Sequence, residues 1–320
     1  MNDSHFKGKK VFVTGGTGLV GSHLVESLVN LGARVIVLFR ELNPKSYFFS
    51  QHLQDKVTLV AGDLKNFERL VDIVTKHEIE YIFHIGAQAI VDTAYHNPLE
   101  TLASNILGTA HILECARLHK KIKGVIIASS DKAYGKTADQ YTEDSPLKGD
   151  HPYDCSKTCT DLLATTYFKT YGVPIAIARC GNIYGPGDFN FNRIVPGIID
   201  ALLNNRLWEI RSNGRFVRDY LYIKDAVSAY ITLGENIENI KGEAFNFSTE
   251  DNLSVLDLLA KTEQILKQKV NYKILDIAKN EIPYQKLNYT KAQKVLRWNP
   301  QYTFDSAISE TYSWYKNNIL

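Results

Sequence analysis

Short runs of apolar residues alternate with longer stretches of helical periodicity through the first 180 residues of the chain. Each run is short enough to be one buried strand, and the stretches between them repeat apolar residues every three to four positions. The predicted strands are Lys10–Thr14, Arg34–Phe39, Val57–Val60, Tyr81–His84, Val125–Ser129 and Pro174–Arg179, and the predicted helices are Gly18–Leu31, Asn66–His77, Asn105–His119 and Asp154–Tyr171. Because strands that alternate with helices form right-handed βαβ units, we expect an α/β fold with a Rossmann-type, doubly wound parallel sheet.

After Gly181 the alternation is broken by turn-rich segments, YGPGDFN and RSNGRF, although helices are still predicted at Ser254–Gln268 and Phe304–Asn317. We therefore expect a dinucleotide-binding domain over residues 1–180, to which about 217–245 returns. Residues 181–320 should form mainly a smaller C-terminal substrate-binding lobe. In such folds, ligands bind in the crevice at the carboxyl edge of the sheet.

Composition excludes several classes of protein. The 320 residues are 44% hydrophobic and 22% charged, as in ordinary globular proteins, and 37 Lys+Arg against 35 Asp+Glu leave a net charge of +2, which gives no case for nucleic-acid binding. Four cysteines without a CxxC pair predict neither a disulfide framework nor a zinc site. No apolar leader or membrane-length stretch is present, so we expect a soluble, cytoplasmic protein with no membrane partner.

A glycine-rich turn, TGGTGLVG, stands directly between the first predicted strand and the first predicted helix. Gly15 permits the tight turn, Gly18 lets backbone approach a pyrophosphate, and Gly21 lets the helix pack closely against the sheet. The helix N-terminus then faces the phosphates. The turn therefore predicts a dinucleotide site made by Gly15, Thr17, Gly18, Leu19, Val20 and Gly21.

The far end of the same ligand would meet the second and third strands. Arg40 follows the second strand, where an acidic residue would indicate NAD. An arginine at this place can hold a 2′-phosphate and favours NADP. The neighbouring Glu41, however, would repel a phosphate. Asp63 and Leu64 follow the third strand, where a carboxylate can accept a hydrogen bond from adenine or, alternatively, cap a helix. The cofactor is predicted as NAD(P), with the choice between the two left open.

Tyr153 and Lys157 lie four residues apart, on one face of a predicted helix. A phenol with a pKa near ~10 is a poor base at neutral pH, and an adjacent ammonium would lower that pKa. Ser130, at the end of the strand before this helix, is placed to bind a substrate hydroxyl. These three residues predict proton abstraction from an alcohol during its oxidation.

Five motifs in order, GxxGxxG, GDL, SSDKAYG, YxxxK and RCGNIYGP, resemble the extended short-chain dehydrogenase/reductase family, the NAD(P)-dependent nucleotide-sugar epimerases and dehydratases. The resemblance runs from Lys10 to Pro300. Asp131-Lys132 after the catalytic serine is similar to the CDP-glucose 4,6-dehydratases, whereas YGKTADQYTEDSPL is closer to epimerases and GDP-mannose dehydratases. The resemblance implies a 4,6-dehydratase, with a GDP-mannose-type dehydratase, a 4-epimerase or a 4-ketoreductase as alternatives and a non-catalytic regulator as a weaker one.

A 4,6-dehydratase oxidises the sugar at C4, eliminates water across C5 and C6, and returns the hydride to C6. The resemblance implies that Tyr153 is the base at O4, with Ser130 steering O4 and Lys157 binding the nicotinamide ribose. Because elimination needs one further acid and base, we assign Asp131 as the acid for the C6 hydroxyl and Lys132 as the C5 base. Alternatively, Lys132 only pairs with Asp131 and a water acts.

The resemblance also implies contacts to a nucleoside-diphosphate hexose from Asn182, Arg193 and Arg218. Arginine suits bidentate phosphate recognition. Family members commonly pair through two helices per subunit, here Asn105–His119 and Asp154–Tyr171, so a homodimer held by a four-helix bundle is predicted.

Overall fold

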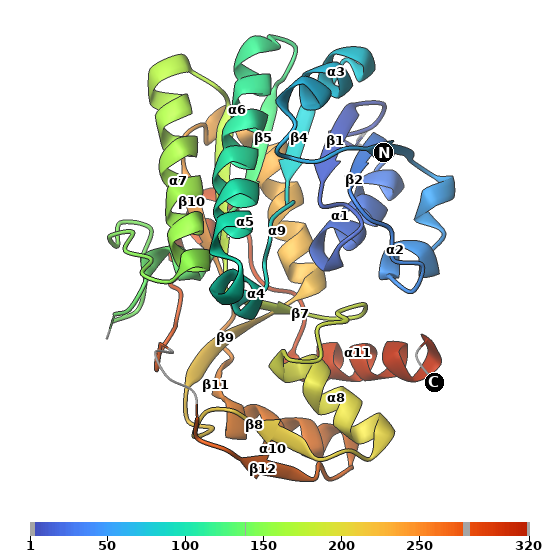
Figure 1. Cartoon of the computed structure of the whole chain (residues 1–320), viewed down its shortest axis with the longest axis vertical. Coiled ribbons are helices and arrows are strands. Elements are labelled where there is room, and N and C mark those ends of the chain that lie inside the picture. The colour runs from blue at the N-terminus through green and yellow to red at the C-terminus, as the bar shows by residue number, and fades with distance from the viewer. Residues whose placement is uncertain (1–3, 138, 278–281, 319–320) are drawn as a thin grey trace.

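A seven-stranded parallel sheet forms the centre of the molecule, in a computed structural model that describes residues 4–137, 139–277 and 282–318 (Figure 1). Its strand order is β10-β6-β5-β4-β1-β2-β3. The strands are β1 (Lys10–Thr14), β2 (Arg34–Phe39), β3 (Thr58–Ala61), β4 (Tyr81–His84), β5 (Gly124–Ala128), β6 (Ile175–Cys180) and β10 (Ala244–Phe247). The predicted Rossmann-type fold is confirmed.

Both faces of this sheet are buried, which explains why its strands are continuous apolar runs. Successive side chains of a strand point to opposite faces. In β1, Val11 and Val13 enter one core and Phe12 enters the other. In β2, Val37 and Ile36 divide between the two cores in the same way.

Helices cover the two faces unequally. The cores show that α1 (Leu19–Asn30) and α9 (Ile223–Glu235) lie on one face, and that α3 (Phe67–His77), α6 (Gly108–Leu118) and α7 (Pro152–Tyr171) lie on the other. The helix predicted to begin at Asn105 continues further toward the N-terminus, through α5 (Pro98–Leu102) and a π-helical turn, η2 (Ala103–Leu107). Asn97 caps α5 and Pro98 takes its first position, where a missing N–H costs nothing.

The smaller lobe lies beneath the sheet in Figure 1. A three-stranded sheet of β11 (Asn252–Ser254), β9 (Val217–Tyr222) and β7 (Asn182–Tyr184) leads into it, and β12 (Tyr272–Ile274) pairs with β8 (Trp208–Ile210). Its core is rich in tyrosine and joins α8 (Ile194–Asn204), α10 (Val255–Leu266) and α11 (Phe304–Asn318). The remaining short helices are α2 (Tyr47–Ser50), η1 (Leu53–Asp55), α4 (Val91–His96), η3 (Asp131–Tyr134), η4 (Ile237–Asn239) and η5 (Ala292–Leu296).

The chain returns to the large sheet after building part of this lobe. β10 pairs in parallel with β6, from Ala244 opposite Ile177 to Phe247 opposite Cys180. Across the described ranges, no helix is both long and apolar enough to cross a membrane.

Candidate active site

The glycine-rich turn after β1 has two glycines whose side-chain space is filled by backbone. Gly15 has φ +69°, and a Cβ there would lie 2.7 Å from the Gly86 backbone. A Cβ on Gly21 would lie only 2.0 Å from the Gly15 carbonyl oxygen. On Gly18, by contrast, a Cβ would meet only that oxygen, at 3.4 Å. Gly15 and Gly21 therefore let the chain fold, whereas Gly18 leaves open space beside the backbone.

The start of α1 fits the pyrophosphate of a dinucleotide. Gly18 is the N-cap and its first turn contains no acidic residue, so the unpaired N–H groups and the positive end of the helix dipole are available to an anion. Thr17 lies in the turn itself, and Leu19 and Val20 pack against the core of the smaller lobe. The residues present thus suit a nicotinamide dinucleotide.

The residues predicted at the adenosine end lie in a polar surface cluster. Arg40 is exposed and forms an ion pair with Glu100 at 3.2 Å, and Glu100 also binds the Lys65 ammonium at 2.7 Å. Asp63 Oδ1 accepts a hydrogen bond from the Lys65 backbone at 2.8 Å. Leu64 lies against Gly108, where a Cβ would approach the leucine side chain at 2.8 Å.

The loop predicted to be catalytic forms η3, shortly after β5. Ser130 Oγ caps this helix by accepting from Lys132 N at 3.2 Å, and it donates to Asp131 Oδ1 at 2.9 Å. Ser130 and Asp131 are both buried. The second carboxylate oxygen, Asp131 Oδ2, is buried without a hydrogen-bond partner among the described residues. A carboxylate oxygen that the protein leaves unsatisfied is suited to meet a substrate hydroxyl.

Tyr153 and Lys157, on α7, face this loop. Burial raises the pKa of the Tyr153 phenol, and the negative charges of Asp131 and Asp154 add to the rise; hydrogen bonding with Ser130 opposes it. The Lys157 ammonium lies 6.0 Å from the centre of the Tyr153 ring and donates to the Ala128 carbonyl at 2.7 Å. Burial lowers the pKa of Lys157 to about 8. The expected depression of the Tyr153 pKa is therefore absent in this structure, because desolvation of the phenolate dominates.

Lys132 reaches a residue that no sequence motif indicated. Its Nζ donates to Oε1 of Gln285, whose side chain is buried. Asp154, next to Tyr153, is also buried, which raises the pKa of its carboxyl to about 6 while the charge of Lys132 opposes the rise. Neither Gln285 nor Asp154 belongs to a recognisable spacing, so only the tertiary structure brings them to Lys132.

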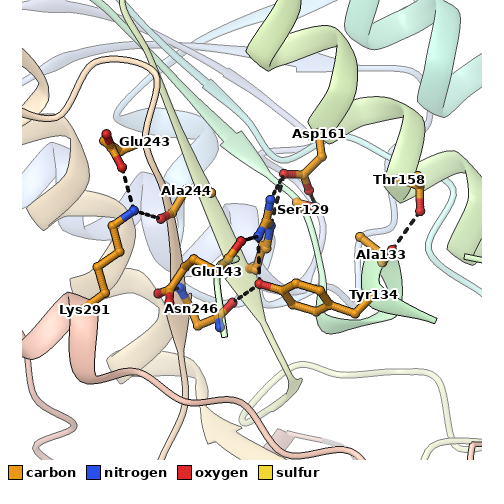
Figure 2. Close-up of polar contacts among 11 residues, drawn as sticks. Ser129, Ala133, Tyr134, Glu143, Thr158, Asp161, Glu243, Ala244, Asn246 and Lys291 are labelled. Carbon is orange, nitrogen blue, oxygen red and sulfur yellow. Dashed lines mark hydrogen bonds and ion pairs between the residues drawn. The ribbon is translucent and has the colours of Figure 1, made fainter. Parts of the chain in front are cut away.

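A buried polar network supports the loop and helix from behind (Figure 2). Asp161, on α7, accepts from Ser129 Oγ and from Arg179 Nη2, the latter at 2.6 Å. Arg179 Nη1 donates to the Tyr134 hydroxyl at 2.7 Å, and that hydroxyl donates to Asn246 Oδ1 at 2.7 Å. The network joins β5, η3, α7, β6 and β10, so it fixes the strand that carries the catalytic loop relative to the helix that carries Tyr153.

The three residues predicted to bind substrate come from the entrance to the smaller lobe. Asn182 lies on β7, opposite Tyr220 of the neighbouring β9, which also carries the buried Arg218. Arg193 forms an ion pair with Asp188 at 2.5 Å, and its charge lowers the pKa of Tyr153 slightly against the effect of burial. The charge of Arg193 therefore acts on Tyr153, at the start of α7.

Known proteins match almost the whole chain. The family model described as GDP-mannose 4,6 dehydratase matches residues 12–311. The CDP-glucose 4,6-dehydratase of Salmonella typhimurium is 32% identical over 99% of this chain and 93% of its own length. The human dTDP-D-glucose 4,6-dehydratase is 27% identical over 97% of this chain and 91% of its own.

The chain belongs to the GDP-mannose 4,6-dehydratase family. It is thus an enzyme of the extended short-chain dehydrogenase/reductases, and the predicted family is confirmed. The solved dTDP-glucose 4,6-dehydratase of Streptomyces venezuelae, with NAD bound, superposes with a TM-score of 0.88 at 26% identity, covering 97% of each chain. The UDP-glucose 4-epimerase of Thermotoga maritima also gives 0.88 at 26% identity, covering 97% of this chain and 100% of its own. Since the fold fits dehydratases and epimerases equally, the reaction must be argued from side chains.

Proposed function

We propose that this family member is a nucleotide-sugar 4,6-dehydratase. The observation that carries the proposal is the pair Asp131-Lys132, which lies on the short helix η3 directly after its N-cap, Ser130. The charge of Asp131 acts on Tyr153, on α7. An epimerase needs one base at O4, whereas a dehydratase needs a further acid and base. The unpartnered Asp131 Oδ2 supports the role of that acid.

The first step would use the residues around Tyr153. Tyr153 accepts the proton of the sugar O4 hydroxyl, and Ser130 orients that oxygen by hydrogen bonding. A bound nicotinamide dinucleotide would supply the acceptor for the C4 hydride and the donor of the hydride that returns to C6. Lys157, which is buried beside Tyr153, contributes positive charge that favours the phenolate when protonated.

The elimination would use Asp131 and Lys132. The C4 ketone acidifies the C5 proton, which the neutral Lys132 amine takes up. The C5–H electron pair forms the C5–C6 double bond, the C6–O bond breaks, and the departing hydroxyl takes a proton from Asp131, which would act in its protonated, carboxylic acid form at this step. One water leaves, so the elimination itself involves no net oxidation or reduction.

For the substrate, we propose CDP-glucose. The identity of 32% with the CDP-glucose enzyme and the Asp-Lys pair support this choice. Asn182, Arg193 and Arg218 would bind the sugar and diphosphate from the smaller lobe, with residues 1–180 and about 217–245 holding the cofactor. A GDP-mannose-type dehydratase is the alternative from the family model, and a 4-epimerase is the alternative supported by the solved neighbour.

We further propose that the cofactor is NAD. The Arg40 guanidinium, which would have to bind a 2′-phosphate of NADP, is paired with Glu100. A 2′-phosphate would have to displace that carboxylate. Calorimetric titration of both dinucleotides tests this choice: tighter binding of NADP would contradict it.

We also propose a cytoplasmic homodimer. Leu107 and Leu162 are about half exposed on neighbouring helices of one face of the molecule, whereas Ile112 and Leu113 point into the core under the sheet. Exposed leucines on adjacent helices are typical of an association surface. Sedimentation of a monomer at micromolar concentration would contradict the dimer.

The dehydratase proposal is tested with a panel of CDP-, GDP-, dTDP- and UDP-hexoses, with mass spectrometry to detect loss of one water. Lys132→Ala should reduce water loss by ~10²–10⁴-fold, because a positioned base is lost, and leave a 4-keto hexose that keeps its C6 hydroxyl. Unchanged dehydration in that variant would make Lys132 a structural residue. A wild type that only inverts C4 would favour the epimerase.

A further inference from the structure

Gln285 lies in a stretch of chain whose backbone is fixed on both sides. On one side, Gln285 N donates to the carbonyl of Val217, on β9, at 3.1 Å. On the other side, Tyr141 N, in the segment after the catalytic loop, donates to the Lys286 carbonyl at 2.9 Å. Because backbone hydrogen bonds hold the chain on both sides of Gln285, its side chain extends toward the loop from a fixed backbone position.

The side chain itself is directed at Lys132. Gln285 is 1% exposed, and its Oε1 accepts from Lys132 Nζ. A protonated lysine offers only donors, so the amide oxygen and not the amide nitrogen faces Lys132 in that form. Gln285 Nε2 is buried without a hydrogen-bond partner among the residues described, as is Asp131 Oδ2. Two residues that flank Lys132 thus each retain a polar atom that the protein leaves unsatisfied, as expected where a ligand completes a site.

As the neighbour of a lysine that acts as a base, the neutral amide of Gln285 is better suited than a carboxylate would be. A Lys132 that removes a proton must be uncharged, and a carboxylate at residue 285 would favour the ammonium form. An amide oxygen can hold the amine without adding a full negative charge. The charged or titratable groups around this pair are Asp131 in the same loop, His151 and Asp154 at the start of α7, Arg218 on β9, and Lys286 beside Gln285.

We propose that Gln285 is a positioning residue for the elimination step, whose amide oxygen holds the Lys132 amine in place to remove the C5 proton. The inference rests on the proposed dehydratase function. It adds a residue from the C-terminal part of the chain to a reaction whose other groups lie on η3, at its N-cap and on α7.

The test compares three variants of the full-length enzyme. Gln285→Leu should lower kcat for water loss by roughly 10-fold to 10²-fold, because the base is no longer held in line. KM and the calorimetric affinity for the nucleoside diphosphate should stay near the wild-type values, and the isotope effect of a C5-deuterated substrate on kcat should rise. Gln285→Glu restores an acceptor for Lys132, but its carboxylate favours the ammonium form of the lysine. Activity should therefore return as pH is raised and Lys132 loses its proton. Gln293→Leu, the same exchange at a side chain that donates to Asn299, should match the wild type.

A double-mutant cycle separates positioning from general structural damage. In a Lys132→Ala background, Gln285→Leu should have no further effect on the residual rate. An equal loss with and without Lys132, or a Gln285→Leu enzyme that dehydrates at the wild-type rate, would overturn the role of Gln285 while leaving the dehydratase function intact. A wild type that removes water from no nucleotide-hexose would overturn the function itself, and this role with it.

Discussion

The turn after β1 and the loop after β5 follow the carboxyl ends of strands in the same sheet, yet they are built differently. The turn contains no charged side chain, and its geometry depends on which glycines lie against backbone. The loop depends on buried Ser130 and Asp131, and on partners from α7 and from the chain around Gln285. A site for a common cofactor can thus be made from backbone alone, whereas the reacting groups must be collected from distant parts of the chain.

Among the variants that test this comparison, Tyr153→Phe, which alters the reacting groups, should have the largest effect. It removes the hydroxyl that we propose as the acceptor of the O4 proton, so kcat should fall by at least ~10²–10⁴-fold. Binding of the nucleotide sugar, measured by calorimetry, should survive because the ring remains. Near-normal turnover would remove Tyr153 from the mechanism.

Arg179→Met tests whether the loop needs its buried support. The substitution removes the arginine that pairs with the buried Asp161 carboxylate, which should cost about 3–5 kcal/mol of unfolding free energy in urea titrations. Arg206→Met is the matched control, since that arginine forms an ion pair with Asp200 at the surface and its loss should cost at most ~1 kcal/mol. Equal losses in the two variants would show that the network does not stabilise the fold.

Two glycine variants test the turn after β1. Gly21→Ala should destabilise the fold by about 1–3 kcal/mol and abolish dinucleotide binding, because its Cβ would overlap the Gly15 carbonyl. Gly18→Ala should weaken dinucleotide binding but change stability by no more than ~0.5 kcal/mol, since its Cβ meets no close neighbour. Thermal unfolding and calorimetry measure both effects. A stable Gly21→Ala protein that binds dinucleotide normally would contradict the steric argument.

Asp154→Asn should show a smaller, pH-dependent effect. The pKa of the folded protein's Asp154, about 6, lies above the model-peptide value of 3.8. Its contribution to stability is therefore complete below pH ~3.8 and lost as pH rises through about 6. A neutral amide avoids that loss, so the variant should be more stable than wild type by about 2 kcal/mol at pH 8 and equal to it at pH 4. A difference between Asp154→Asn and wild type that does not change with pH would contradict the argument.

Sequence patterns predicted the large sheet well and the smaller lobe poorly. The apolar runs of β1, β2, β4 and β6 mark strands because both faces of the sheet are covered, whichever residues lie opposite. The strands of the smaller lobe are short and contain polar residues; β7, for example, has only three residues and pairs with β9, whose sequence is far away. Their hydrogen-bonding partners, not their own pattern, make them strands.

The candidate site divides in the same way. The spacing of Ser130, Tyr153 and Lys157 could be recognised because adjacent elements of a βαβ unit carry them. The rise in the pKa of Tyr153 could not be predicted from the sequence, since it depends on how completely the surrounding chain excludes water. Gln285 was missed because it stands in no motif and reaches Lys132 only through pairings with Val217 and Tyr141.

The sequence by itself therefore determined the parallel sheet, the backbone turn that suits a dinucleotide and the choice of candidate reacting groups, because each depends on local periodicity or on neighbours close in the chain. Only the tertiary structure decided that β10 joins the sheet beside β6, that Asp131 keeps an unsatisfied oxygen, and that Gln285 holds Lys132. Burial, desolvation and hydrogen bonding between distant segments are properties of the packed chain, and no local pattern encodes them.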